Sequence, residues 1–265
     1  MNQITNVETS DPGWKNLYRV GGIAALTAGV LFRRNIAAEI GLFSTHPSPT
    51  TASDWFQLLQ SNRLLGLAYL NIFDLVNYAL LGLMFLALYA VLRRDSKSAM
   101  AIATTLGLVG IAVYLASNTA FSMLSLSDQY AAATTDAQRT TLLAAGQALL
   151  AINRFSGHGA YPGSGGYVSL LLIAVAGMIT SIVMIRSTAF NRATAYVGIL
   201  ASALDLAYCI AFAFVPALDS ETLAISFIPA AGLFLMVWHV LIGWRLYKLG
   251  KVDRVEASHE KQAVV

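Results

Sequence analysis

Two aspartates stand inside apolar stretches of this chain that are long enough to cross a bilayer. Asp74 lies within the stretch 64–92, and Asp205 lies within the stretch 193–215. An ionised carboxylate in hydrocarbon is costly unless it is paired, hydrated or protonated, so carboxylates inside membrane helices are functional candidates by default. Their chemistry would be the binding of a proton, a small solute or a lipid headgroup.

Further polar residues accompany Asp74 on one side of its stretch. On a helix that turns about 100° per residue, the following five residues fall within an arc of roughly 120°: Arg63, Asn71, Asp74, Asn77 and Tyr78. This face has to look into protein or water. Counted from Leu64 at ~1.5 Å per residue, Asp74 is expected ~15 Å along the helix.

Asp205 belongs to a similar stripe, formed by residues three or four positions apart: Thr194, Gly198, Ser202, Asp205 and Cys209. Counted from Pro216, Asp205 is expected about 16 Å below the outer end of its span, at a depth that matches Asp74. Two carboxylates at matched depth would fit two inverted three-helix halves. The matching text, FDLV against LDLA, covers only four residues and establishes no repeat.

The candidate site combines these carboxylates with nearby polar residues in the outer half of the bundle: Arg33 or Arg34, Asn71, Asp74, Asn118 and Asp205. The two arginines have two interpretations, because long basic side chains either reach to the membrane surface or pair with a carboxylate such as Glu39 or Asp74. The asparagines are equally explained by interhelical hydrogen bonds of roughly 0.6 kcal/mol each. A functional role is favoured for Asp74, because an uncharged residue would join helices at lower cost.

The elements that position this site are membrane helices. The chain has 265 residues, of which 57% are hydrophobic and 12% charged, with a mean hydropathy of +0.62. Soluble proteins average about 45–50% apolar and about 25% charged residues. The composition therefore predicts an all-α polytopic membrane protein, in which membrane lipid is the surrounding partner.

Six apolar stretches predict six spans, at 17–43, 64–92, 99–124, 167–185, 193–215 and 223–247. They form one transmembrane domain, 17–248, between a polar tail at 1–16 and a charged, disordered tail at 249–265. The outer loop 127–166 is expected to contain an amphipathic helix, which begins at a capping box made by Thr135 and Gln138. The apolar run 142–152 is short for a crossing, so it either lies over the bundle or provides a seventh span.

The charge pattern predicts the orientation. Basic residues at 15–19, 93–97, 186–192 and 245–254 fall on one side of the six spans, and most loop aspartates fall on the other. Because positive residues favour the cytoplasmic side, both termini are predicted to be cytoplasmic in a plasma-membrane protein. The net charge of +3 is spread over helix ends, which argues against a nucleic-acid partner. Trp238 and Trp244 are expected in an interfacial aromatic belt.

Other chemistry finds little support. The four histidines never stand four residues apart, and the single cysteine excludes a cysteine-based zinc site and an internal disulfide, so no metal site is predicted. His239 is expected to pack inward. No nucleotide-binding loop, dinucleotide fingerprint or haem-attachment motif occurs, so no cofactor is predicted. Ser164 stands in PGSGG, which is not the nucleophile elbow of a hydrolase.

Three pieces of text carry a family resemblance: the run from Asn62 and Arg63 through Asp74 to LALYAVLRR, then YVSLLLIAVAGMITSIVMIRS, and finally FIPAAGLFLMVWHVLIGWRL. Together they resemble a prokaryotic family of uncharacterised multi-pass membrane proteins that is catalogued as a domain of unknown function. The resemblance covers 18–248. It implies an all-helical membrane bundle and carries over no activity, cofactor or catalytic residue.

The sequence thus predicts binding or passage of a small solute, proton or lipid headgroup through a polar cavity in the outer half, with Asp74 as the charged anchor. One alternative is an intramembrane enzyme that acts on a lipid or small amphiphile. Asp74 or Asp205 would then be the acid or base, assisted by His158. The other alternative is a non-catalytic membrane protein whose polar residues only specify packing, and its protein partners are not identifiable from the sequence.

Overall fold

The computed structural model describes residues 12–45, 49–152, 164–215 and 220–251; the side chains at positions 12, 32–45, 152, 220–226 and 228 lie outside the description. The described chain is helical. A short 3-10 turn at Pro12–Trp14 precedes ten α-helices: α1 Lys15–Thr45, α2 Ala52–Ser61, α3 Arg63–Tyr69, α4 Ile72–Leu92, α5 Lys97–Ser117, α6 Ala120–Ala132, α7 Asp136–Ile152, α8 Ser164–Arg186, α9 Arg192–Phe214 and α10 Ser220–Leu249. The all-α prediction is confirmed.

Six long helices form a closed ring. α1 packs against α4 and α10, α5 against α4 and α8, and α9 against α8 and α10. Small residues allow the closest of these contacts: a Cβ on Gly22 of α1 would lie 2.6 Å from the backbone nitrogen of Tyr247 in α10, and one on Gly243 would lie 2.8 Å from the carbonyl oxygen of Gly22. The first and last helices of the ring are therefore in backbone contact.

The outer surface of the ring is apolar. Ile102, Val109 and Phe214 are among the large hydrophobic side chains that it exposes. Among the described residues, five helical segments are long and apolar enough to cross a membrane: Ile72–Leu92, Lys97–Ala132, Ser164–Arg186, Arg192–Phe214 and Pro229–Leu249. The chain is therefore a multi-pass membrane protein. The first predicted span, 17–43, coincides with α1, which is not among these five, and the count of six remains a prediction.

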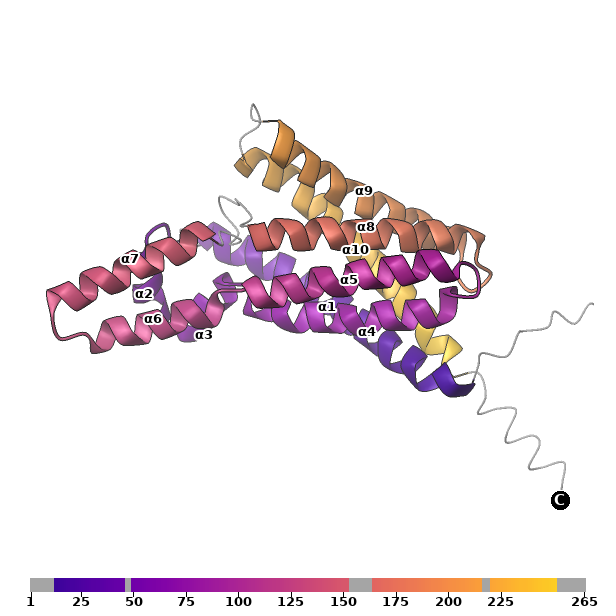
Figure 1. The fold of residues 1–265 in the computed structure, drawn as a ribbon, viewed down its shortest axis with the longest axis horizontal. Helices are drawn as coiled ribbons and strands as arrows, with labels where there is room; N and C mark the ends of the chain where they lie inside the picture. Colours follow the sequence, from indigo (N-terminus) through magenta and orange to yellow (C-terminus); the bar gives the residue numbers. More distant parts are fainter. Residues whose placement is uncertain (1–11, 46–48, 153–163, 216–219, 252–265) are drawn as a thin grey trace, which may run out of the picture.

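Four shorter helices form a lobe at one end of the ring. α2, α3, α6 and α7 pack on one another beyond the ends of the long helices (Figure 1). Their shared core is separate from that of the ring and includes Trp55 and Phe56 of α2, Tyr69 of α3, Met123 of α6 and Leu150 of α7. α7, the expected amphipathic helix, packs against α2 and α6, and Thr135 and Gln138 form the predicted capping box at its start.

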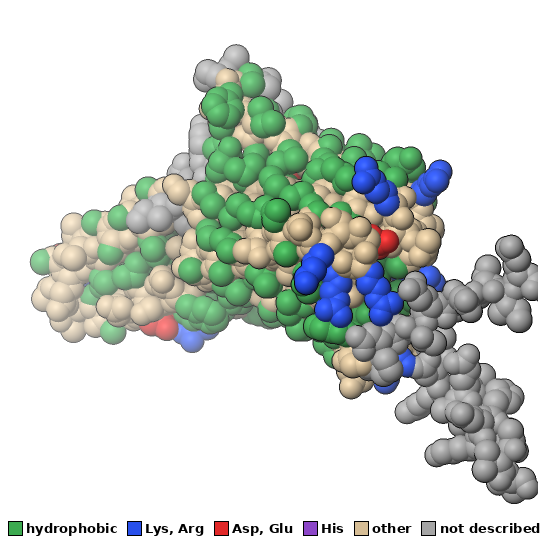
Figure 2. Space-filling view, turned by 45° about the vertical axis from the view of Figure 1, so that its right-hand side comes forward, with side chains coloured by type: hydrophobic (Ala, Val, Ile, Leu, Met, Phe, Trp, Pro, Cys, Tyr) green, Lys and Arg blue, Asp and Glu red, His purple; other side chains and the backbone are tan. Residues whose placement is uncertain are grey.

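Basic side chains gather at the opposite end, which we call the basic end (Figure 2). The guanidinium of Arg93, just after α4, lies 4.7 Å from the ring centre of Trp14, just before α1. Nε of Arg245 in α10 donates to the carbonyl of Ala189 between α8 and α9. These contacts involve the ends of five ring helices, α1, α4, α8, α9 and α10, and the gathered basic residues agree with the charge pattern predicted for the cytoplasmic side.

The predicted continuous span 64–92 is wrong, because the helix breaks at Leu70 and Asn71. Asn71 has φ 59°, in the left-handed region that asparagine tolerates better than most residues, and α4 begins only at Ile72. α3 leaves the ring and joins the lobe, where Arg63 pairs with Asp128 of α6 at 2.6 Å. Arg63 is thus not on the helical face of Asp74. The third span breaks in the same way, since α5 ends at Ser117 and α6 begins at Ala120.

Candidate functional site

The break before α4 determines where Asp74 lies. With α4 starting at Ile72, Asp74 is in the first turn, about 3 Å along the helix, and not ~15 Å. Asp205 lies nine residues before the end of α9, about 14 Å from that end. The two carboxylates are therefore not at matched depth, which removes the main support for inverted halves. At the start of α4, Asp74 benefits from the positive end of the helix dipole.

Two tyrosines hold Asp74 in place. The hydroxyl of Tyr114 in α5 donates a hydrogen bond to Oδ2 of Asp74 at 3.3 Å. The ring of Tyr78, one turn beyond Asp74, stacks on Tyr114 with 3.7 Å between ring centres and 13° between ring planes. Tyr114 is 4% exposed, so this hydrogen bond is shielded from bulk solvent. The pair fixes both the position of the carboxylate and the contact between α4 and α5.

Tyr78 also connects Asp74 to Asp205. It is close enough to interact electrostatically with both carboxyl groups, although they belong to α4 and α9. Ser169 of α8 lies beside it. The structure thus brings four ring helices together around the Tyr78 side chain. We refer to Asp74, Tyr78, Tyr114 and Asp205 as the carboxylate cluster.

Asp205 is the most enclosed member of the carboxylate cluster. Its side chain is 9% exposed, and it makes no hydrogen bond or ion pair with the residues that the structure describes. Cys209, one turn further along α9, is fully buried beside it. The inward stripe predicted on this helix is confirmed, because all five of its residues are buried. A carboxyl group in this position favours its neutral form or a bound cation.

Asn71 and Asn118 lie at the edge of the carboxylate cluster and serve the helix breaks. Nδ2 of Asn118 donates to the carbonyl of Leu70 at 3.5 Å, and its Oδ1 accepts from the backbone nitrogen of Ala120 at 3.0 Å. Asn118 therefore joins the break before α4 to the break before α6. Asn71 forms the turn itself. These contacts agree with the alternative that the asparagines hold helices together.

The remaining predicted groups lie outside the description. Arg33 and Arg34 belong to α1, which neighbours α4 and α10, but their side chains are outside the described residues. His158 falls in the undescribed segment 153–163. Within the described chain, no three His, Cys, Asp or Glu side chains come close enough to hold a metal ion.

Tyr78 and Tyr114 were not predicted as site residues. Tyr78 shares a helical face with Asp74 and could have been included on spacing alone. Tyr114 shares one side of the third apolar stretch with Gly107 and Gly110, a pattern of small residues that is typical of a packing surface. Those glycines do allow close packing, since a Cβ on Gly107 would touch the Phe85 ring at 3.0 Å. Sequence spacing does not reveal that this side of α5 also contacts Asp74 of α4 through Tyr114.

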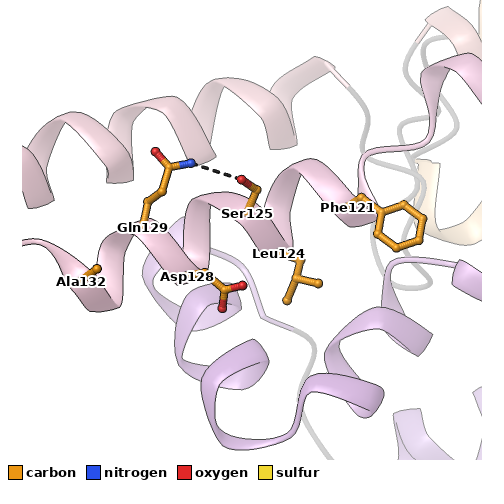
Figure 3. A pocket seen from close by; sticks show the side chains of 6 residues that line it. All are labelled: Phe121, Leu124, Ser125, Asp128, Gln129 and Ala132. Atoms are coloured by element: carbon orange, nitrogen blue, oxygen red, sulfur yellow. Dashed lines mark hydrogen bonds between the residues drawn. The ribbon is translucent and has the colours of Figure 1, made fainter.

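A hollow lies on the surface of the lobe (Figure 3). It is an open groove of about 440 Å³ along one face of α6, and six side chains line it: Phe121, Leu124, Ser125, Asp128, Gln129 and Ala132. Nε2 of Gln129 donates to the Ser125 hydroxyl at 3.2 Å within it. Its polar side chains are exposed to solvent, so it lacks the enclosed polar groups that distinguish the carboxylate cluster.

Comparison with known proteins gives one match. A family model described as "Domain of unknown function (DUF4386)" matches residues 17–244, which is most of the chain and agrees with the resemblance drawn from the sequence. No curated protein and no solved structure matches.

Proposed function

This chain belongs to the DUF4386 family of unknown function, and we propose that it binds a proton, or a small cation in its place, at Asp205. The observation that carries the proposal is the burial of this carboxyl group, 9% exposed and without a hydrogen bond or ion pair among the described residues. An isolated carboxylate in a membrane helix is costly, and a bound positive charge removes that cost.

Asp74 complements Asp205 in this proposal. It lies at the lobe end of the ring, in the first turn of α4, where it is close to the positive end of the helix dipole and accepts the hydrogen bond from the Tyr114 hydroxyl. An ionised carboxylate there attracts cations toward the interior. Tyr78 is close to both carboxyl groups and interacts electrostatically with each of them. In this proposal Asp74 attracts the cation at the lobe end of the ring, and Asp205 is the group that binds it.

The orientation in the membrane is part of the same proposal. The basic end faces the cytoplasm in a plasma-membrane protein, and the lobe faces outward, as expected when positive residues stay inside. Cations would then reach Asp74 from the outer side.

Infrared difference spectroscopy during a pH titration of the purified protein tests the binding group. We expect a protonated carboxyl band in the wild type that is absent in Asp205→Asn and retained in Asp95→Asn. Asp95 is a matched control, because it is exposed at the basic end. Added sodium or potassium ions should displace the band if the site also accepts a metal cation, and should leave it unchanged if the site binds protons alone. An identical band in the wild type and Asp205→Asn would refute the proposal.

A further inference from the structure

Polar side chains continue inside the ring from Asp205 toward the basic end. Ser202 lies one turn before Asp205 on the same face of α9, and Gly198 and Thr194 follow at the same spacing. Ser202 and Thr194 are 2% and 3% exposed. Thr194 lies in the first turn of α9, where its hydroxyl bonds to Oδ1 of Asn191 at 2.6 Å. A buried polar stripe therefore leads from the proposed binding group to the basic end.

Two glycines bring side chains of α8 and α10 onto this stripe. Ser181 Oγ of α8 and Trp238 Nε1 of α10 each lie 2.2 Å from the point where a Cβ on Gly198 would stand. Ser202 Oγ lies 2.7 Å from the equivalent point on Gly177 of α8. The absence of both Cβ atoms lets three helices place polar atoms within about one helical turn of one another. We call Ser181, Ser202 and Trp238 the inner polar segment.

Several polar atoms at this level lack partners. Ser181 Oγ, Thr180 Oγ1 and Trp238 Nε1 are enclosed, and none has a hydrogen bond to the described residues. Thr180 and Ser181 are 0% exposed, and Trp238 is 2% exposed. A buried polar group without a partner destabilises the folded protein. Such groups are normally satisfied by water or a ligand, so the inner polar segment is suited to water or a hydrated cation.

Trp238 is not in an aromatic belt as the sequence predicted. Its indole is buried against Gly177 and Gly198, whereas Trp244 is 55% exposed beside the Lys248 ammonium. The indole N–H donates a hydrogen bond but accepts none, so it can hold a water molecule but cannot relay a proton. The indole lies against Gly198, which is located on α9 between Asp205 and the basic end.

We propose that the inner polar segment is the route by which a proton or small cation bound at Asp205 crosses to the basic end, with Trp238 as the group that closes it. This inference rests on the proposed function and extends it from binding to passage across the membrane. For a proton, the Asp205 carboxyl transfers H⁺ to an adjacent water and becomes a carboxylate. The Ser202 and Ser181 hydroxyls, which both donate and accept, order the waters that carry the proton onward.

Other titratable groups around this route have defined positions. Tyr78 of α4 and Cys209 of α9 are close to Asp205. His239 of α10 is buried next to Trp238, and its Cβ lies 3.5 Å from the Cβ position of Gly29 in α1. His239 is therefore on the α1 side of α10, away from Gly198. Asp205 remains the carboxyl group at the start of the route.

The test is proton flux into liposomes that contain the purified full-length protein and a trapped pH-sensitive dye, driven by a potassium gradient with valinomycin. We expect wild-type flux above that of protein-free liposomes and none in Asp205→Asn. Ser202→Ala and Ser181→Ala should each slow flux about tenfold, as expected for a lost hydrogen bond in the rate-limiting passage. Trp238→Ala should raise flux about tenfold, because the closing group is gone.

Matched variants separate the outcomes. Trp238→Phe keeps most of the bulk and should raise flux less than Trp238→Ala, and Trp238→Leu serves if the alanine variant does not fold. Trp244→Ala and Ser125→Ala change exposed residues and should have no effect.

If the Asp205 carboxyl titrates but the wild type and the Trp238→Ala or Trp238→Leu variant fail to conduct, passage is refuted and binding stands. If Asp205 does not titrate, the proposed function itself fails. Equal flux in the wild type and in Trp238→Ala refutes the closing role.

Discussion

At the scale of single residues, glycine determines how closely the ring helices approach. A Cβ atom added to Gly22 would lie close to the backbone of α10, 2.6 Å from the Tyr247 nitrogen and 2.9 Å from the Gly243 carbonyl oxygen. Backbone atoms cannot move aside as a side chain can. The equivalent point on Gly82 of α4 is only in ordinary contact, 3.7 Å from a methyl group of Leu108.

We therefore expect Gly22→Ala to destabilise the protein by about 1–3 kcal/mol, the usual cost of overpacking a tight contact. Gly82→Ala should be neutral or slightly stabilising, because alanine is the better helix former. Thermal unfolding of the two variants in the same detergent makes the comparison. An unchanged Tm for Gly22→Ala would show that α1 and α10 are not held in backbone contact.

Single residues also show what could be predicted from the sequence. The stripe that contains Asp205 could be predicted, because an uninterrupted helix converts sequence spacing directly into a shared face. The neighbours of Asp74 could be predicted only in part. The left-handed conformation of Asn71 and the bond from Asn118 to the Leu70 carbonyl interrupt the helix, and both depend on contacts with α5 and α6. Trp238 was wrongly predicted in the interfacial aromatic belt, because its sequence position does not show whether the indole is buried between helices.

At the scale of elements, α2 is anchored by its first turn. The Asp54 carboxylate accepts from the backbone nitrogen of Thr51 at 3.0 Å, while the Thr51 hydroxyl accepts from the Asp54 nitrogen at 3.2 Å. This capping box lowers the pKa of Asp54 below its usual value of 3.8, mainly through the hydrogen bonds to Thr51. It starts the helix whose Trp55 and Phe56 fill the core of the lobe.

The depressed pKa of Asp54 gives the lobe a pH dependence. Because the folded pKa lies below the unfolded value, the cap contributes stability above about pH 4 and loses it as the pH falls through the folded pKa. We expect the fluorescence of Trp55, in a protein whose other tryptophans are phenylalanine, to report loosening of α2 below this range. Asp54→Asn should lack that acid step. A step of equal size in both proteins would assign the effect to another carboxyl group.

At the scale of the whole molecule, the ring and the lobe are joined through the helix pairs α3–α4 and α5–α6. The existence of the ring could be predicted from the apolar stretches, and the basic end from the charges. The lobe could not, because its core combines the segments 52–70 and 120–150, which are far apart in the sequence. Patterns within one helix carry no information on such pairing.

The proposed orientation leads to a labelling experiment on whole cells. In a Cys209→Ser background, a cysteine at Ala148 on the exposed face of α7 should react with a membrane-impermeant maleimide. A cysteine at Ser98, exposed near the start of α5, should react only after the membrane is permeabilised. The opposite pattern would place the lobe in the cytoplasm and reverse the proposed direction of access.

The contact between α1 and α10 also has a consequence for how the protein is made. A chain emerges from the ribosome from its N-terminus, so α1 is the first ring helix available and α10 the last. Until α10 arrives, the α1 face that carries Gly22 has no partner, and neither Ser181 nor the stripe of Asp205 is covered by Trp238. The arrival of α10 is therefore the step that encloses the polar interior. A chain that stops before residue 220 lacks α10, so Gly22, Ser181 and the stripe of Asp205 stay without the contacts that α10 provides.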